Sequence, residues 1–126
     1  MAEIYVPALN RSCILPNLPN KRFYHSQVGL RACGGLKGQR HVGDTCEQTC
    51  DTWNPEKGSW ASKDVSLIGC RARNSWTTAS GEGTYLIGGY GWGSGNGDKG
   101  WDNAYTTDLL KPDGTVVSGF NLTTFT

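Results

Sequence analysis

An internal repeat with a period of about 50 residues constrains this chain more than any other feature. A segment that begins at Arg22 and runs through a short apolar stretch to Gly34-Gly35 returns as a segment from Arg71 to Gly88-Gly89. The offset is 49 residues at the arginines and 54 at the glycine pairs, and an extra loop around residues 78–83 accounts for the difference. Such a fixed period is typical of architectures in which small identical units pack on their neighbours.

A second shared unit follows each glycine pair. Residues 49–60 resemble residues 107–116, with Thr49 matched to Thr107 and Trp60 matched to Val116. Both read as strand, Pro-to-Gly turn and strand, because Pro presets the turn and Gly accepts a positive φ. A looser version spans residues 3–15. We therefore expect four antiparallel strands in residues 22–63, four more in 71–120, and a separate hairpin in 3–15.

Composition agrees with an all-β fold of one domain. Glycine is the commonest residue, at 18 of 126, and no long amphipathic helix can be drawn. The 12 basic and 11 acidic residues nearly balance, so nothing in the charge attracts nucleic acid. No apolar run approaches the roughly 20 residues of a membrane span.

A four-stranded unit of this length with Gly-Gly after its second strand suits one blade of a β-propeller. Blades fan around an axis, so the backbone at their crowded end must approach its neighbour without a Cβ atom. We expect the wider outer part to be filled by large aromatic side chains, with these candidates: Tyr24, Trp53, Trp60, Trp76 and Tyr85.

The glycine pairs, Trp60 after a glycine turn, and the pattern Arg22-x-x-His25 resemble kelch repeats. The chain is most similar to secreted kelch-like proteins of invertebrates. The likeness runs through residues 3–7, Cys13-x-Leu-Pro, His25-Ser-Gln-x-Gly-Leu and Ala-Cys-Gly-Gly at 32–35. The resemblance implies a ring-shaped propeller used for protein binding, adhesion or matrix structure. It also gives structural roles to the arginines, His25 and the glycine pairs.

The strand count gives residues 1–126 about two and a half blades, whereas closed propellers have typically 4 to 8. An incomplete propeller exposes a blade face and sheet edges. We therefore expect this chain to be part of a longer, six-bladed propeller. Assembly of several copies is the alternative, although each copy would bring a surplus hairpin.

Five cysteines without a zinc-type CxxC arrangement favour disulfides and an extracellular location. Cys33 and Cys50 are expected on adjacent strands, where their side chains can bond. Cys13, Cys46 and Cys70 would then leave one sulfur over. Free buried thiols throughout are the alternative. The sequons at Asn10 and Asn121 agree weakly with secretion.

The glycine-rich stretch 89–100 is interpreted as a surface loop. Gly95-x-Gly97-x-x-Gly100 matches a dinucleotide fingerprint, but the helix that must follow it is absent. Trp92 and Trp101 flank this loop and are the candidate partner-binding residues. Asn96, Asp98 and Asp102 are weak candidates for Ca²⁺ ligands, because the spacing of a known calcium loop is missing.

No arrangement of side chains indicates catalysis or a cofactor. His25 could act as a base, but no Ser, Cys or carboxylate is placed by a known local signature to complete a triad. We expect a histidine that bonds to the neighbouring blade. The sequence thus predicts a non-enzymatic binding module. The alternative is a piece of a propeller enzyme whose catalytic blades lie outside these residues.

Overall fold

The computed structural model describes residues 2–39, 42–69, 71–92, 101–103 and 106–120. Within these ranges the regular structure is antiparallel β-sheet and one short 3-10 turn, so the prediction of an all-β chain is confirmed. The elements are β1 (Ala2–Val6), η1 (Pro7–Leu9), β2 (Arg11–Leu15), β3 (Ser26–Val28), β4 (Arg31–Cys33), β5 (Leu36–Gln39), β6 (Val42–Cys46), β7 (Thr49–Asn54), β8 (Ser59–Ser66), β9 (Ser75–Ala79), β10 (Gly83–Ile87), β11 (Tyr90–Trp92), β12 (Trp101–Asn103), β13 (Thr107–Leu110) and β14 (Val116–Ser118).

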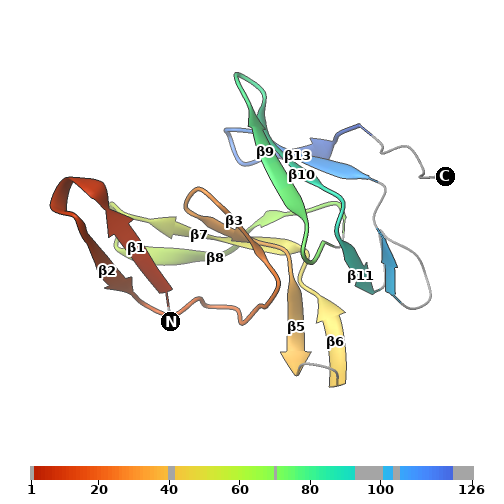
Figure 1. Cartoon of the computed structure of the whole chain (residues 1–126), viewed down its shortest axis with the longest axis horizontal. Helices are drawn as coiled ribbons and strands as arrows, with labels where there is room; N and C mark the ends of the chain where they lie inside the picture. The colour runs from red at the N-terminus through yellow and green to blue at the C-terminus, as the bar shows by residue number, and fades with distance from the viewer. Residues whose placement is uncertain (1, 40–41, 70, 93–100, 104–105, 121–126) are drawn as a thin grey trace.

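Each repeat forms a four-stranded up-and-down sheet. The first sheet has the order β3-β4-β7-β8, and the second has the order β9-β10-β13-β14. Figure 1 shows that the two sheets follow one another along the chain, with β1–β2 at one end. The strands of the first sheet extend to Ser66, three residues beyond the predicted boundary.

Two further hairpins, which the sequence did not predict, extend the middle of each sheet. β5–β6 follows β4 in the first repeat, and β11–β12 follows β10 in the second. Gly34 and Gly35 have φ of +69° and +89°, a left-handed backbone that ends β4 and redirects the chain into β5. β6 and β11 lie side by side, so both hairpins project from the same end of the sheets (Figure 1).

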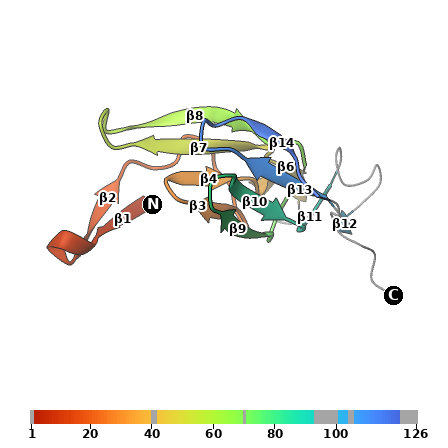
Figure 2. The ribbon, with the colours of Figure 1, turned by 90° about the horizontal axis from the view of Figure 1, so that it is seen from above.

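The core lies between the two sheets. It is built from apolar side chains that point inward from both: Val28, Cys33, Cys50, Val65 and Leu67 from the first repeat, and Leu86, Leu110 and Val116 from the second. In Figure 2, seen from above, the two sheets overlap and their strands follow the same order, from β8 to β3 and from β14 to β9. Burial of these side chains is the main force that holds the two repeats together.

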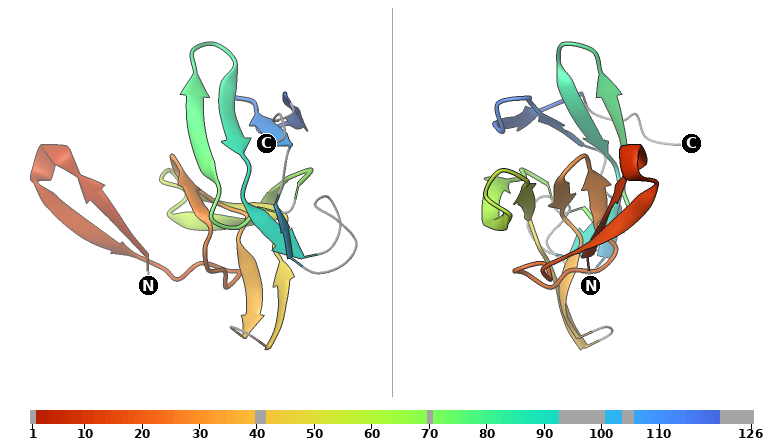
Figure 3. Two further views of the ribbon diagram at one scale, coloured as in Figure 1. Left: turned by 45° about the vertical axis from the view of Figure 1, so that its right-hand side comes forward. Right: turned by 90° about the vertical axis from the view of Figure 1, so that its left-hand side faces the viewer.

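The β1–β2 hairpin stands apart from this core at the opposite end from β11–β12, as the left view of Figure 3 shows. Its strands pair from Ala2 opposite Leu15 to Val6 opposite Arg11. Asn10 closes the turn with φ of +47°. Trp60 on β8 donates its indole N–H to the carbonyl of Pro16 at 2.8 Å, which ties the segment after the hairpin to the first sheet.

After the glycine pairs, the structure aligns the two repeats differently from the sequence comparison. Arg22 donates to the carbonyl of Thr49, and Arg71 makes the same bond to the carbonyl of Thr106. Thr49 therefore corresponds to Thr106, and the match to Thr107 was wrong by one residue. Two adjacent threonines fit the pattern equally well. The shift is hidden because the chain from Leu110 to its partner Val116 is one residue shorter than the chain from Trp53 to its partner Trp60.

Candidate functional site

A buried ion pair lies inside each four-stranded sheet. The guanidinium of Arg22 lies 3.0 Å from the carboxylate of Asp51 on β7, and that of Arg71 lies 3.2 Å from Asp108 on β13. All four side chains are at most 1% exposed. Each arginine lies in the segment before the first strand of its sheet, and its side chain reaches the third strand. It therefore links these two parts of the sheet in the interior. We call this arrangement the arginine clamp.

Backbone carbonyls complete each clamp. Arg22 donates to the carbonyls of Gly34 and Thr49, and Arg71 donates to those of Gly88 and Thr106. The sequence identified both arginines but missed Asp51 and Asp108. Asp51 follows Thr49 at the same spacing as Asp108 follows Thr106. This shared spacing becomes visible only when Thr49 is matched to Thr106 instead of Thr107. Because the charges are paired and buried, the clamp is a structural feature.

The glycine pairs lie where the chain makes close backbone contacts. A Cβ atom on Gly34 would be 2.7 Å from the carbonyl oxygen of Arg71, in the next repeat. Gly35 and Gly89 instead face their own repeats, where a Cβ atom would be 2.6 Å from the carbonyl of Phe23 and 2.9 Å from that of Ala72. No side chain fits at these distances, which explains the glycines.

Backbone hydrogen bonds join the two sheets at this point. The N–H of Gly35 donates to the carbonyl of Arg71 at 2.8 Å, and the N–H of Arg73 donates to the carbonyl of Tyr24 at 2.9 Å. The guanidinium of Arg73 also stacks over the Tyr24 ring, 3.9 Å from its centroid.

His25 lies beside this junction but does not use Nδ1 to bond across it. Ser26 makes the bond to the second sheet, donating its hydroxyl to Oδ1 of Asn74 at 2.7 Å. Nδ1 of His25 is buried and has no hydrogen-bond partner among the described residues. Burial, and secondly the positive charge of Arg22, lower the pKa of His25 below 6.5.

The predicted disulfide between Cys33 and Cys50 is confirmed. The two residues are directly opposite on β4 and β7, with Cα atoms 4.1 Å apart. Cys46 is also in a disulfide, Cys13 is a half-buried free thiol on β2, and Cys70 lies outside the described residues. The alternative of free thiols throughout is therefore wrong.

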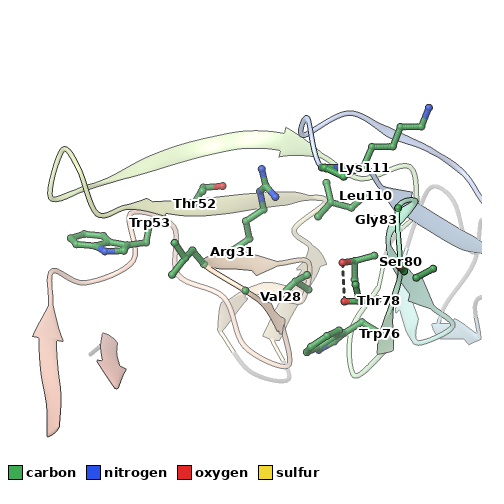
Figure 4. Close-up of a pocket in the computed structure, with 16 residues that line it drawn as sticks. Val28, Arg31, Thr52, Trp53, Trp76, Thr78, Ser80, Gly83, Leu110 and Lys111 are labelled. Carbon is green, nitrogen blue, oxygen red and sulfur yellow. Dashed lines mark hydrogen bonds between the residues drawn. The ribbon is translucent and has the colours of Figure 1, made fainter. Parts of the chain in front are cut away.

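A groove of about 670 Å³ opens between the two sheets, and we call it the inter-sheet groove. Figure 4 shows Arg31 and Lys111 toward one side of the opening and Trp76 toward the other. The side chains that line it come from both sheets: Val28, Leu30, Arg31, Thr52 and Trp53 from the first, and Trp76, Thr78, Ser80, Thr84, Leu110 and Lys111 from the second.

The chemistry of the inter-sheet groove is cationic and aromatic. Arg31 reaches toward the turn before β14, where a Cβ atom on Gly114 would lie 3.6 Å from its Nη2 atom. Nε of Arg31 is buried and has no hydrogen-bond partner in the described part of the chain. Trp76 is 45% exposed. None of the residues that line the groove is acidic. The groove can therefore hold an anionic group beside an aromatic ring.

A second, smaller pocket of about 370 Å³ lies between the β1–β2 hairpin and the first sheet. Tyr5, His25, Trp53 and Trp60 line it. The two tryptophan rings meet edge to face with centroids 5.4 Å apart. They are paired positions of β7 and β8 within one sheet, so this contact is not the packing between blades that the sequence led us to expect. The β1–β2 hairpin forms one wall of this pocket.

The remaining candidates lie wholly or partly beyond the described residues. Trp92 and Trp101 pair in backbone register across β11–β12, but the structure does not describe their side chains or that of Asp102. Asn96, Asp98, Asn121 and the glycines at 95, 97 and 100 lie outside the described residues.

The other sequon residue, Asn10, lies within the described residues. It is exposed and accepts a hydrogen bond from the hydroxyl of Tyr5.

The described ranges contain no cluster of three or more His, Cys, Asp or Glu residues that could hold a metal ion. They also contain no helix with the length and apolar character needed to cross a membrane. In comparisons with known proteins, no protein-family model and no curated protein matches this chain. A functional assignment therefore rests on the geometry of the two sheets.

Proposed function

We propose that this chain is a non-enzymatic, extracellular module of a kelch-type β-propeller that binds protein. The observation that carries the proposal is the repetition of the arginine clamp. The same arginine, aspartate, threonine and glycine positions make the same bonds in two consecutive sheets. Units that repeat their internal bonds and stack face to face are what a propeller requires.

The outer face of the second sheet supports a further neighbour. Val28 on β3 is buried against the second sheet, whereas Thr77, its equivalent on β9, is exposed. Val117 and Phe120, also in the second repeat, are 37% and 51% exposed. An uncovered apolar sheet face of this kind favours association. Another blade, from a longer chain or from a second copy, would cover it.

An oxidising compartment accounts for the disulfides. The Cys33–Cys50 disulfide joins β4 to β7 next to the arginine clamp, and Cys46 is in a disulfide as well. Such bonds persist mainly outside the reducing cytosol. The exposed sequon at Asn10 agrees with this location.

The mass of the protein in solution tests the proposal. Light scattering should give a multiple of the 13.6 kDa chain mass, because the uncovered apolar face of the second sheet favours association with another blade. A Val117→Asp variant should lower the mass toward that of one chain, and Lys57→Asp, in the exposed turn before β8, should not. A stable 13.6 kDa monomer at all concentrations would contradict a propeller assembled from copies of this chain.

A further inference from the structure

We propose that the inter-sheet groove binds an acidic peptide segment in an extended conformation. The proposal rests on the proposed function as a protein-binding module and adds the class of partner. It depends on residues of this chain alone, since both sheets that form the groove are present.

Charge is the first argument. Arg31 and Lys111 approach the groove from different sheets, and no carboxylate lines it. The carboxylates of Asp64, Glu82 and Asp113 do not line it. Each accepts a hydrogen bond from a hydroxyl, that of Thr52, Tyr85 and Thr115 respectively. Charge-assisted hydrogen bonds between a guanidinium or an ammonium group and a carboxylate are among the stronger ones in proteins.

The aromatic wall is the second argument. Trp76 stands on β9 with nearly half of its surface exposed, next to the buried side chains of Val28 and Leu110. Tryptophan and arginine are the residue types enriched among the energetically important contacts of protein interfaces. An apolar side chain of the partner would pack against this ring, while its neighbouring acidic side chains face the two cations.

The edge of the second sheet favours a peptide over a saccharide. β9 pairs with β10 on one side, and no strand in the described ranges pairs with its other side. Alternate residues of an antiparallel edge strand direct their N–H and C=O groups outward. An extended peptide can add to such an edge through main-chain bonds while its side chains enter the adjacent groove. A volume of about 670 Å³ also lies within the range of ligand pockets.

A random 12-residue peptide library displayed on phage, selected against the whole 126-residue protein, tests this proposal. We expect enriched sequences that combine Asp or Glu with an apolar or aromatic residue. The best peptide, made synthetically, should bind in a fluorescence anisotropy titration. Replacing its acidic residues with the corresponding amides should weaken binding at least about tenfold, because charged hydrogen bonds are the stronger ones.

Variants of residues that line the inter-sheet groove test whether the peptide binds there. Lys111→Gln, Arg31→Gln and Trp76→Ala should each weaken the peptide by at least about fivefold. Lys111 is exposed, so that variant remains informative even where the others disturb folding. Lys57→Gln is the matched control, because Lys57 occupies the corresponding turn of the first repeat and does not line the groove.

Three results would overturn the proposal: enrichment of basic or uncharged peptides, no enrichment, or binding that the groove variants do not change. No peptide enrichment together with binding of a sulfated heparin oligosaccharide that the groove variants weaken would assign the groove to a saccharide instead. Failure here is separate from failure of the propeller proposal, since the solution mass does not depend on Arg31, Trp76 or Lys111.

Discussion

The backbone N–H of Gly35 donates a 2.8 Å hydrogen bond to the carbonyl of Arg71, so the glycine pair of the first sheet is joined directly to the arginine of the second. The side chain of that arginine pairs with Asp108 in its own sheet. Arg71 thus takes part in two structures at once, the internal clamp of one repeat and the junction between repeats. Changes at this junction should affect both sheets together.

A methyl group at Gly34 tests how tight the junction is. Gly34→Ala should lower the free energy of unfolding by about 3 kcal/mol, because a Cβ atom would lie 2.7 Å from the carbonyl of Arg71 and φ is +69°. Gly58→Ala has a similar φ of +63° and open space around it, so it should lose only about 1 kcal/mol. Urea unfolding of both variants measures the difference. Equal losses would mean that the junction can relax.

The arginine clamp should depend on its buried charge. Asp108→Asn keeps the shape of the side chain but leaves the Arg71 guanidinium without its counter-charge, so the free energy of unfolding should fall by about 3–5 kcal/mol. Asp113→Asn is the control, because its carboxylate is exposed in a turn; hydrogen bonds from Thr115 hold the pKa of Asp113 below its usual value. That control should shift the urea midpoint little. A small effect at Asp108 would show that solvent reaches the clamp.

The repeat could be found from the sequence because its most restrictive positions are chemically distinctive. Gly34, Gly35 and Gly89 mark backbone that admits no Cβ atom, and buried arginines such as Arg22 and Arg71 are rare. Cys33 opposite Cys50 followed from the strand order alone. These features depend on one residue type at one position, so a sequence displays them directly.

The inter-sheet groove could not be found in this way. Its members Arg31, Trp76 and Lys111 are ordinary residue types without a shared spacing, and they meet only because the two sheets stack. The hairpins β5–β6 and β11–β12 were also missed, since their strands are short and rich in glycine and polar residues. Tertiary packing, rather than local preference, decides both.

The cysteines give a prediction for the unreduced protein. Cys33–Cys50 and the disulfide at Cys46 leave Cys13 as the described free thiol, so iodoacetamide should modify one cysteine and mass spectrometry should locate it at Cys13. The Cys13→Ser variant should then show no modification. Modification of Cys33 or Cys50 without reductant would contradict the assigned bond.

Removal of the Cys33–Cys50 bond should weaken the first sheet. The bond closes a loop of 17 residues, and its loss in a Cys33→Ala/Cys50→Ala variant should cost about 3 kcal/mol in free energy of unfolding. Urea unfolding measures this loss. The Cys13→Ser variant serves as the control and should retain the stability of the parent protein. An unchanged midpoint in the double variant would mean that the bond does not constrain the unfolded chain.

His25 should make stability depend on pH in the weakly acidic range. Its pKa is lowered in the folded protein by burial and by Arg22, so the unfolded chain binds the proton more readily. Stability should therefore be constant above the unfolded pKa of about 6.5, fall as pH drops below that value, and level off below the folded pKa. Melting temperatures measured from neutral to weakly acidic pH should show this fall in the parent protein and a smaller one in His25→Gln. The chain has one other histidine, and His41→Gln should retain the full dependence. If His41→Gln removes the pH dependence of the melting temperature and His25→Gln does not, the buried ring of His25 is not the titrating group.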